Sequence, residues 1–290
     1  MRPEGTASGG EGLARSCGTG GPDWIRSTGP IGGVELFQAW FAGAAYETHR
    51  HDTYAIGLTD CGVQVFGYRG AQRSSTAGQV VALYPDEAHD GRAGTAEGFG
   101  YRIVYVEPSC LADALRVLRG RPSPLPFVRE VVSANARLSR AIRGAFHTRL
   151  EPLAVDSLVL DLAEGLAEGA GGAARPASSR SADVRALERA RQFLEAEKTR
   201  VVHSSELEAA TGLTRYELAR QFRVLFGTSP HRYLLMRRLD FARQLIRLGR
   251  PLADVALEAG FADQAHFTRA FKSGSGLTPA VYRSLSAPTA

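Results

Sequence analysis

The sequence predicts an α+β protein of two domains, a β-barrel with accessory helices followed by an all-α domain with two helix-turn-helix units. Three observations lead to this fold class. The last hundred residues contain one helical pattern twice, residues 30 to 108 contain short apolar segments separated by turn residues, and residues 169 to 183 form a segment rich in Gly, Ala and Ser. A chain of 290 residues can form two domains with separate cores.

The helical pattern repeats after 49 positions. The repeat aligns Leu218, Arg220, Phe222, Arg223, Gly227, Pro230 and Tyr233 with Phe267, Arg269, Phe271, Lys272, Gly276, Pro279 and Tyr282. Five of these pairs are identical, which predicts two copies of one small helical unit.

The first copy has the start and stop signals of a helix-turn-helix. A helix over 205–211 ends at Gly212, and Thr214 with Glu217 forms a capping box that starts a second helix. The buried stripe of this second helix is predicted to contain Leu218, Phe222 and Leu225. Its polar face would offer Tyr216, Arg220 and Arg223 to the major groove of DNA.

In the second copy, a helix over 252–259 is followed by Gly260 and by Asp263 as the cap of the next helix. The predicted buried residues are Phe267, Ala270 and Phe271, and the polar face consists of Gln264, His266, Arg269 and Lys272. Ser273, Gly274 and Ser275 stand where the first copy has 224–226, and a helical Gly costs about 1 kcal/mol relative to Ala, so we expect this helix to end before this segment is complete.

A connecting helix over 230–248 is predicted between the two copies. Its 19 residues span roughly 28 Å at about 1.5 Å per residue, close to the ~34 Å turn of B-DNA. A single chain could therefore place two helices in successive major grooves.

Residues 203 to 283 resemble the DNA-binding domain of the AraC/XylS family of transcription regulators, most closely in the stretch ADVALEAGFADQAHFTRAFKSGSGLTPAVYR. The resemblance implies that Tyr216, Arg220, Arg223, Gln264, His266 and Arg269 face bases or nearby phosphates. Ala219 and Ala265 depart from family members that have polar side chains there. The resemblance also implies promoter DNA and RNA polymerase as partners, with activation as the commoner outcome.

The charge distribution is consistent with DNA binding. Residues 183 to 290 contain 17 Arg and Lys against 11 Asp and Glu, a net charge of +6, whereas residues 1 to 182 have a net charge of −1. A basic domain gains affinity for phosphates through counterion release. The alternative is a solvated basic surface that reflects an Arg-rich composition.

Other features restrict the class of protein. Residues 1–22 are Gly-rich and predict a disordered tail. The absence of a signal-like apolar segment or a membrane span predicts a cytoplasmic protein, and the three scattered cysteines are typical of reduced thiols.

The first half, over 23–108, predicts a small barrel or sandwich. Its expected strands cover 34–41, 53–59, 63–68, 79–83 and 99–106, with turns at 60–62 and 78–79. The segments HRHDTYAIG and PDEAH resemble the cupin-type ligand-binding domain that precedes the DNA-binding domain in many AraC-family proteins.

Three histidines, His49, His51 and His89, fall in these cupin-like segments. Metal cupins add a carboxylate on the same strand face, but Asp52 is adjacent to His51 and would point to the other face. We therefore expect no metal and no cofactor, and a structural or effector-binding role for the imidazoles.

One predicted strand face from His49 to Thr59 is small and polar, whereas the other carries Tyr54, Ile56 and Leu58. If the small face points inward, the barrel has room for a small polar effector, with Tyr68 and Tyr101 as further contacts. The alternative is a barrel filled by Tyr and Val side chains.

Residues 109–168 return to a helical period and predict accessory helices, with apolar stripes at 111–118, 138–146 and 158–166. The resemblance implies that such helices form a homodimer contact. The linker at 169–183 predicts that the barrel and the helical domain at 184–285 fold independently.

These features together predict an effector-controlled transcription regulator. Two alternatives stay open: a metal-dependent cupin enzyme or metal sensor fused to a DNA-binding module, and an architectural DNA-binding protein without an effector. The absence of a recognisable catalytic pattern argues against an enzyme.

Overall fold

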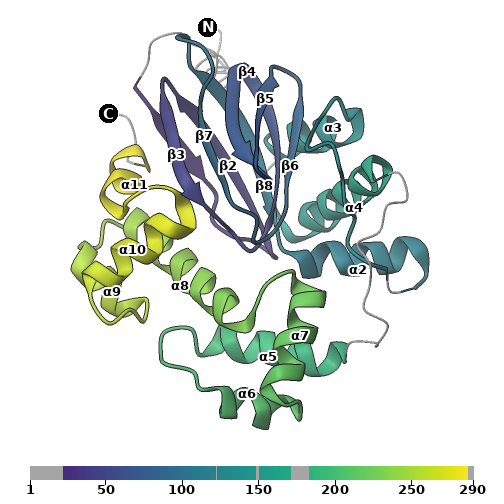
Figure 1. Ribbon diagram of the computed structural model, residues 1–290, viewed down its shortest axis with the longest axis vertical. Coiled ribbons are helices and arrows are strands. Elements are labelled where there is room, and N and C mark those ends of the chain that lie inside the picture. Colours follow the sequence, from purple (N-terminus) through teal and green to yellow (C-terminus); the bar gives the residue numbers. More distant parts are fainter. Residues whose placement is uncertain (1–21, 122, 148–149, 171–182, 287–290) are drawn as a thin grey trace, which may run out of the picture.

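The computed structural model describes residues 22–121, 123–147, 150–170 and 183–286 (Figure 1). Most of the expected N-terminal tail and most of the expected linker lie outside these residues, and so does Cys17. The first half of the chain is a β-rich layer flanked by three helices, and the second half is entirely helical (Figure 1).

The strands form two antiparallel sheets that share one long strand. The first sheet has the order β1-β2-β8-β4-β6-β9, and β4 continues into the second sheet, where it pairs with β5 and β7, and β7 pairs with β3. The strands are β1 (Trp24–Ser27), β2 (Val34–Phe41), β3 (Ala44–His49), β4 (Tyr54–Tyr68), β5 (Ala71–Thr76), β6 (Val80–Leu83), β7 (His89–Ala93), β8 (Phe99–Val106) and β9 (Val132–Ser133).

The predicted bounds of β2 and β8 are confirmed, but the hairpin expected at 60–62 is wrong. The two strands expected on either side of this turn are one strand, β4, with a register shift against β8 between Thr59 and Cys61. Gly62, with φ +70°, packs against the backbone of Gly98 in this irregular segment. A bulge adds one residue to the strand and reverses which side chains face each side. Ala55 before the bulge and Phe66 after it accordingly lie in the same core cluster.

The continuous strand expected from His49 to Thr59 is also interrupted. His49 ends β3, residues 50–53 bend outside the regular strands, and β4 begins at Tyr54. The assignment of the two faces of β4 is nevertheless correct, because Tyr54, Ile56 and Leu58 join the cluster under the flanking helices, whereas Thr59 hydrogen-bonds Ser75 at 2.7 Å on the other side.

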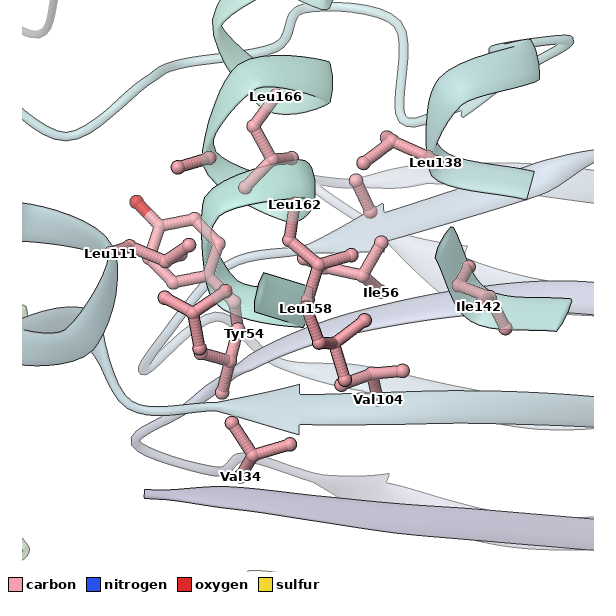
Figure 2. Close-up of a cluster of buried hydrophobic side chains, with 14 of the residues drawn as sticks. Val34, Tyr54, Ile56, Val104, Leu111, Leu138, Ile142, Leu158, Leu162 and Leu166 are labelled. Atoms are coloured by element: carbon pink, nitrogen blue, oxygen red, sulfur yellow. The ribbon is translucent and has the colours of Figure 1, made fainter. Parts of the chain in front are cut away.

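Three accessory helices cover one face of the first sheet. They are α2 (Pro108–Arg119), α3 (Ala136–Ala145) and α4 (Pro152–Gly169). Figure 2 shows Leu158, Leu162 and Leu166 of α4 packed toward Ile56 and Val104 of the sheet. The predicted apolar stripes therefore cover the sheet, except that Leu118 is 41% exposed.

The second half contains the two predicted helix-turn-helix units on either side of a connecting helix. Its helices are α5 (Val184–Ala196), α6 (Ser204–Thr211), α7 (Arg215–Phe226), α8 (Pro230–Arg247), α9 (Leu252–Glu258), α10 (Gln264–Ser275) and α11 (Pro279–Ser286). The capping box of α7 is present, with Thr214 and Glu217 each bonded to the other residue's backbone amide, and Asp263 caps α10.

The expectation that α10 ends early is wrong, because the helix continues to Ser275. Gly274 lies where α10 crosses α8, and a Cβ at this position would be 2.6 Å from the side chain of Leu239. The close approach of the two helices thus requires a residue without a side chain, and the buried contact offsets the low helix propensity of glycine.

The two halves do not have separate cores. One cluster of buried residues includes Phe37, Phe41 and Tyr101 of the sheets together with Leu239 of α8 and Phe271 of α10. The expectation of independent folding is therefore wrong for the second helix-turn-helix unit, which shares its hydrophobic core with the barrel. The first unit has a cluster of its own, formed by helices α5 to α8.

Candidate functional site

The exposed face of α7 carries the side chains expected to contact DNA. The side chain of Tyr216 is 77% exposed, and both Arg220 and Arg223 are exposed. Leu218, Phe222 and Phe226 on the opposite face are buried. The capping box fixes where α7 begins, so the local sequence determines which side chains the helix presents to solvent.

The corresponding face of α10 presents Gln264, His266 and Arg269, which are all exposed. Lys272 differs from these three residues because its Nζ lies 2.8 Å from Oε2 of Glu47 in β3. The end of α10 is also joined to the barrel by backbone hydrogen bonds, from Glu47 N to Gly276 O at 3.2 Å and from Arg50 N to Ser273 O at 3.3 Å.

The connecting helix α8 uses its arginines to contact the barrel. Arg232 lies 2.9 Å from Asp86, Arg237 lies 3.0 Å from Asp52, and Arg243 lies 3.6 Å from Glu35. Arg247 lies 4.0 Å from Glu35. Part of the basic excess of the second half therefore faces carboxylates of the first half, and the sequence-based assignment of all of it to phosphates is incomplete.

Arg237 is at the centre of this network and is only 7% exposed. Its Nη1 donates to Glu107 at 2.9 Å, and its Nη2 donates to both oxygens of Asp52 and lies 3.1 Å from Asp240. Burial raises the pKa of Asp52 to about 6, against the opposing effect of Arg237. A buried ion-pair network of this kind is costly to break by removing one partner.

A cavity lies where the network meets the open end of the barrel. Its empty volume, including the space at its mouth, is about 770 Å³. Both halves of the chain form its wall, which consists of Pro30, Gly33, Val34, Glu35, Phe37, Tyr46, His49, His51, Asp52, Thr53, Tyr105 and Glu107 from the first half and Met236, Arg237, Asp240, Arg243, Gly274, Ser275, Leu277 and Tyr282 from the second.

Two of the predicted effector-binding residues, His49 and His51, line this cavity. His89 lies beside them, with ring centroids 4.3 Å from His49 and 4.8 Å from His51. Burial lowers the pKa of all three imidazoles, to about 3 for His49, so that each ring is neutral at pH 7. The sequence thus identified a real cluster, although only two of its members line the cavity.

The other two predicted effector-binding residues lie elsewhere. Tyr68 is hydrogen-bonded to Glu87 and, with His89, lines a separate surface depression at β4, β5 and β7. Tyr101 is buried against Phe99, and its hydroxyl contacts that of Tyr46, which does line the cavity. Aromatic rings fill the interior between the sheets here, as the alternative interpretation of the barrel anticipated.

The sequence did not identify the cavity residues of the second half, which lie mainly on α8. Arg237, Arg243 and Tyr282 are more than 120 residues from the barrel strands that they face. In the sequence, Arg237 and Arg243 are part of an amphipathic helix, and nothing local distinguishes them from arginines that contact phosphates. Glu35 could have been noticed as the one charged residue of a mostly apolar strand.

In the described part of the chain, no three His, Cys, Asp or Glu side chains are arranged to hold a metal ion. No helix in the described ranges is long and apolar enough to cross a membrane.

Two protein-family models match the chain in consecutive regions. The AraC-like ligand binding domain matches residues 31–163, and a helix-turn-helix domain matches residues 207–284. The chain belongs to the AraC/XylS family. It is accordingly a transcription regulator with a ligand-binding domain and a DNA-binding domain.

Individual AraC-family relatives agree with this assignment. The chain is 25% identical over 227 residues to the uncharacterized HTH-type transcriptional regulator YbfI of Bacillus subtilis. The aligned region covers 76% of this chain and 81% of YbfI. It is 35% identical over 92 residues to the right origin-binding protein of Escherichia coli, about a third of the length of either chain. These relatives are named as regulators or DNA-binding proteins, so the metal-dependent enzyme is not favoured.

A solved structure shares the arrangement of the whole chain. ToxT from Vibrio cholerae superposes with a TM-score of 0.61 over 92% of this chain and 98% of ToxT, at 12% sequence identity. The similarity extends over both halves, which supports the fold of a β-rich domain joined to a helical domain.

Proposed function

We propose that a small-molecule effector binds in the cavity between the two halves and changes how the two helix-turn-helix units engage promoter DNA. The observation that carries this proposal is the composition of the cavity wall, because a single ligand would contact both β2 of the barrel and α8, α10 and α11 of the DNA-binding half. A ligand shifts an equilibrium between two arrangements only if it binds them with different affinity. A cavity formed by both halves has this property, because it changes whenever the halves move.

A small-molecule effector is also consistent with a structural neighbour. One ToxT structure is described as bound to an unsaturated fatty acid. For the present chain, we assign His49 and His51 to the effector site. His89 supports the two imidazoles and Tyr101 supports Tyr46 of the wall, whereas Tyr68 belongs to the separate depression.

The proposed DNA contacts are Tyr216, Arg220 and Arg223 on α7 and Gln264, His266, Arg269 and Lys272 on α10. The test replaces Arg220 or Arg269 by Ala and measures binding to a site selected from random DNA. If each arginine makes a bidentate contact with guanine, we expect a loss of about 1 to 3 kcal/mol on the selected site and relaxed preference at one base pair.

Arg283 on the exposed side of α11 provides a matched control, and Arg283→Ala should leave affinity nearly unchanged. Equal losses on selected and random DNA would show that Arg220 and Arg269 contact only phosphates. If both variants bind DNA with wild-type affinity, the assignment of α7 and α10 as the helices that contact DNA bases is contradicted.

We further propose that the protein acts in the cytoplasm as a homodimer and an activator that contacts RNA polymerase. Support for dimerisation comes from the accessory helices, where Leu153 on α4 is 79% exposed and an apolar depression lies between α3 and α4. Leu153→Glu should convert dimers into monomers in sedimentation experiments. A monomeric wild-type protein would contradict this part of the proposal.

A further inference from the structure

The cavity contains a buried acceptor that lacks a hydrogen-bond partner. His51 is 5% exposed, and its Nδ1 lies 2.8 Å from the carbonyl oxygen of Thr53. A carbonyl can only accept, so Nδ1 carries the proton and Nε2 has a free lone pair. Within the described residues, Nε2 of His51 is buried without a partner. A buried polar atom of this kind calls for a ligand or a water molecule that donates to it.

His49 presents the same chemistry at the same cavity. Its Nδ1 lies 2.9 Å from the carbonyl oxygen of Glu47, which again leaves Nε2 as the acceptor. Because burial keeps both rings neutral, Nε2 of each ring stays unprotonated near pH 7 and can only accept. The two imidazoles therefore favour a ligand that supplies hydrogen-bond donors.

The charged groups of the cavity wall favour a cation over an anion. Four carboxylates line it, from Glu35, Asp52, Glu107 and Asp240, against the two guanidinium groups of Arg237 and Arg243. Arg237 already binds three carboxylates, and Arg243 donates to Asp240 at 2.7 Å. An anionic ligand would have to displace these carboxylates, which would leave them buried and unpaired.

Glu35 is the carboxylate best placed to contact a ligand. It is 8% exposed, and one of its oxygens accepts a hydrogen bond from Ser27. Its other oxygen, Oε2, lies 3.6 Å from Nη1 of Arg243, which is too long for a hydrogen bond. Arg247 lies 4.0 Å from Oε1 and likewise makes no hydrogen bond to Glu35, so among the described residues the lone pairs of Oε2 are open to an ammonium donor.

Most of the rest of the wall is apolar or aromatic. Phe37, Tyr105 and Met236 line the cavity, and Tyr105 packs edge-on against His51 with ring centroids 5.3 Å apart. Aromatic faces attract cations as well as apolar groups. The cavity thus combines buried acceptors, an excess of carboxylates and a surface for a hydrocarbon or an aromatic ring.

We propose that the effector is a small organic cation with an apolar part, whose ammonium group donates to Nε2 of His51 and to Glu35. This inference rests on the proposed function, because it assigns a ligand class to the same cavity. Its binding would join the barrel to α8 through Glu35, which also faces Arg243.

The experiment compares three probes that share a phenyl ring on a short chain and differ mainly in charge: 2-phenylethylamine, 2-phenylethanol and 3-phenylpropanoate. Each is titrated calorimetrically into the full-length protein near neutral pH. We expect the amine to bind at least about tenfold more tightly than the alcohol, and the carboxylate to bind most weakly. A preference for the carboxylate, equal binding of amine and alcohol, or no binding of any probe at millimolar concentration would overturn the proposal.

Two variants locate the interaction. Glu35→Gln keeps the shape of the side chain and should reduce the affinity for the amine about tenfold while leaving that for the alcohol unchanged. His51→Phe removes the acceptor and should weaken the binding of both the amine and the alcohol. His231→Phe, at an exposed position on α8, should change neither and serves as the control. If a variant does not fold, the ranking of the three probes by the wild-type protein still decides the question.

A DNA-binding titration with each probe at saturation separates this inference from the proposed function. If the carboxylate or the alcohol binds best and changes DNA affinity, the protein is effector-controlled but the ligand class is wrong. If the amine binds best and DNA affinity does not change, the ligand class is correct and the proposed control of DNA binding is wrong.

Discussion

The two helix-turn-helix units share one sequence pattern, but they pack against different parts of the molecule. The core of the first unit contains Phe222 and Leu218 and is completed by α5 and α8. The core of the second unit contains the equivalent residues, Phe271 and Phe267, and continues into the barrel. Sequence repeats determine the local fold of each unit, whereas residues outside the repeat determine what each unit packs against.

This difference has a consequence for regulation. A ligand in the interdomain cavity would contact Gly274, Ser275 and Leu277 at the end of the second unit, but no residue of α6 or α7 contributes to the described wall. An effector would therefore act directly on the second unit and reach the first through α8. The predictions below test whether the two units differ in this way.

The largest expected effects come from the equivalent phenylalanines Phe222 and Phe271, which are both fully buried. Replacing either by Ala should cost about 3 to 5 kcal/mol in the free energy of unfolding. The measurement is urea unfolding followed by the fluorescence of Trp24 and Trp40, which both lie in the barrel, beside far-UV circular dichroism of the helices.

Because Phe271 belongs to the shared core, Phe271→Ala should lower the unfolding midpoint in both signals. Phe222→Ala should lower it in circular dichroism and leave the fluorescence transition nearly unchanged. If both variants shift the fluorescence transition equally, the two units are coupled to the barrel to the same degree and the comparison is wrong.

The glycines that end α7 and α10 give the next largest expected difference in the free energy of unfolding. Gly227 and Gly276 both have φ +72°, so Ala at either position should cost about 1 to 2 kcal/mol for the left-handed backbone. A Cβ on Gly276 would also lie 2.7 Å from the backbone oxygen of Glu47, whereas one on Gly227 would first meet Pro85 at 3.2 Å. Gly276→Ala should therefore cost a further ~1 to 3 kcal/mol by overpacking.

The same urea unfolding experiment tests this prediction, with far-UV circular dichroism as the signal, because it reports the helices of both units. Gly144→Ala in α3, where an added Cβ meets no atom within 4 Å, is the control and should not destabilise the protein. Equal losses for Gly227→Ala and Gly276→Ala would mean that the contact between α10 and β3 contributes little.

Local features of the fold could be predicted from the sequence, but contacts between the halves could not. Thr214, Glu217 and Asp263 identify helix starts because a cap acts within one turn. Strands β3, β5 and β7 were missed because their sequences, such as AQRSST and HDGRA, are polar and lack an apolar alternation. The bulge near Cys61 contains the same residue types as a turn, and only its pairing with β8 distinguishes the two.

The site was partly predictable for the same reason. His49, His51 and His89 were found because two short segments resemble a known ligand-binding domain. Arg237 and Arg243, which line the same cavity, were not found, because a helical repeat gives no information about what lies against the side of α8.

Acidification should weaken the contact of the second unit with the barrel. The pKa of His49 in the folded protein is about 3, below the ordinary 6.5, so its contribution to stability is present above about pH 6.5 and is lost as the pH falls toward 3. At about pH 5 the loss is about 2 kcal/mol for such a histidine. Burial lowers the pKa of His51 and His89 in the same direction.

Asp52 opposes this effect, because its raised pKa of about 6 lets the folded protein bind a proton before the unfolded chain does. With three histidines against one carboxylate, the free energy of unfolding followed by tryptophan fluorescence should fall between pH 7 and pH 5. A protein equally stable at both pH values would contradict the assignment of neutral, buried rings.

The smallest expected effect concerns Lys272 and its equivalent in the first unit, Arg223. Arg223 is exposed, whereas Lys272 forms an ion pair with Glu47 in which the two side chains are 43% and 68% exposed. Such exposed pairs contribute about 0.2 to 1 kcal/mol, so Glu47→Gln should raise DNA affinity by up to about fivefold by releasing Lys272 to a phosphate. Because each phosphate contact releases counterions, the salt dependence of DNA binding should steepen by about one unit of slope.

Adding Lys272→Ala to Glu47→Gln should remove the gain in DNA affinity and the steeper salt dependence. Arg223→Ala should flatten the salt dependence whether or not Glu47 is present. If Glu47→Gln changes neither affinity nor slope, the barrel does not restrain the reading face of the second unit through this ion pair, and the two units differ only in their cores.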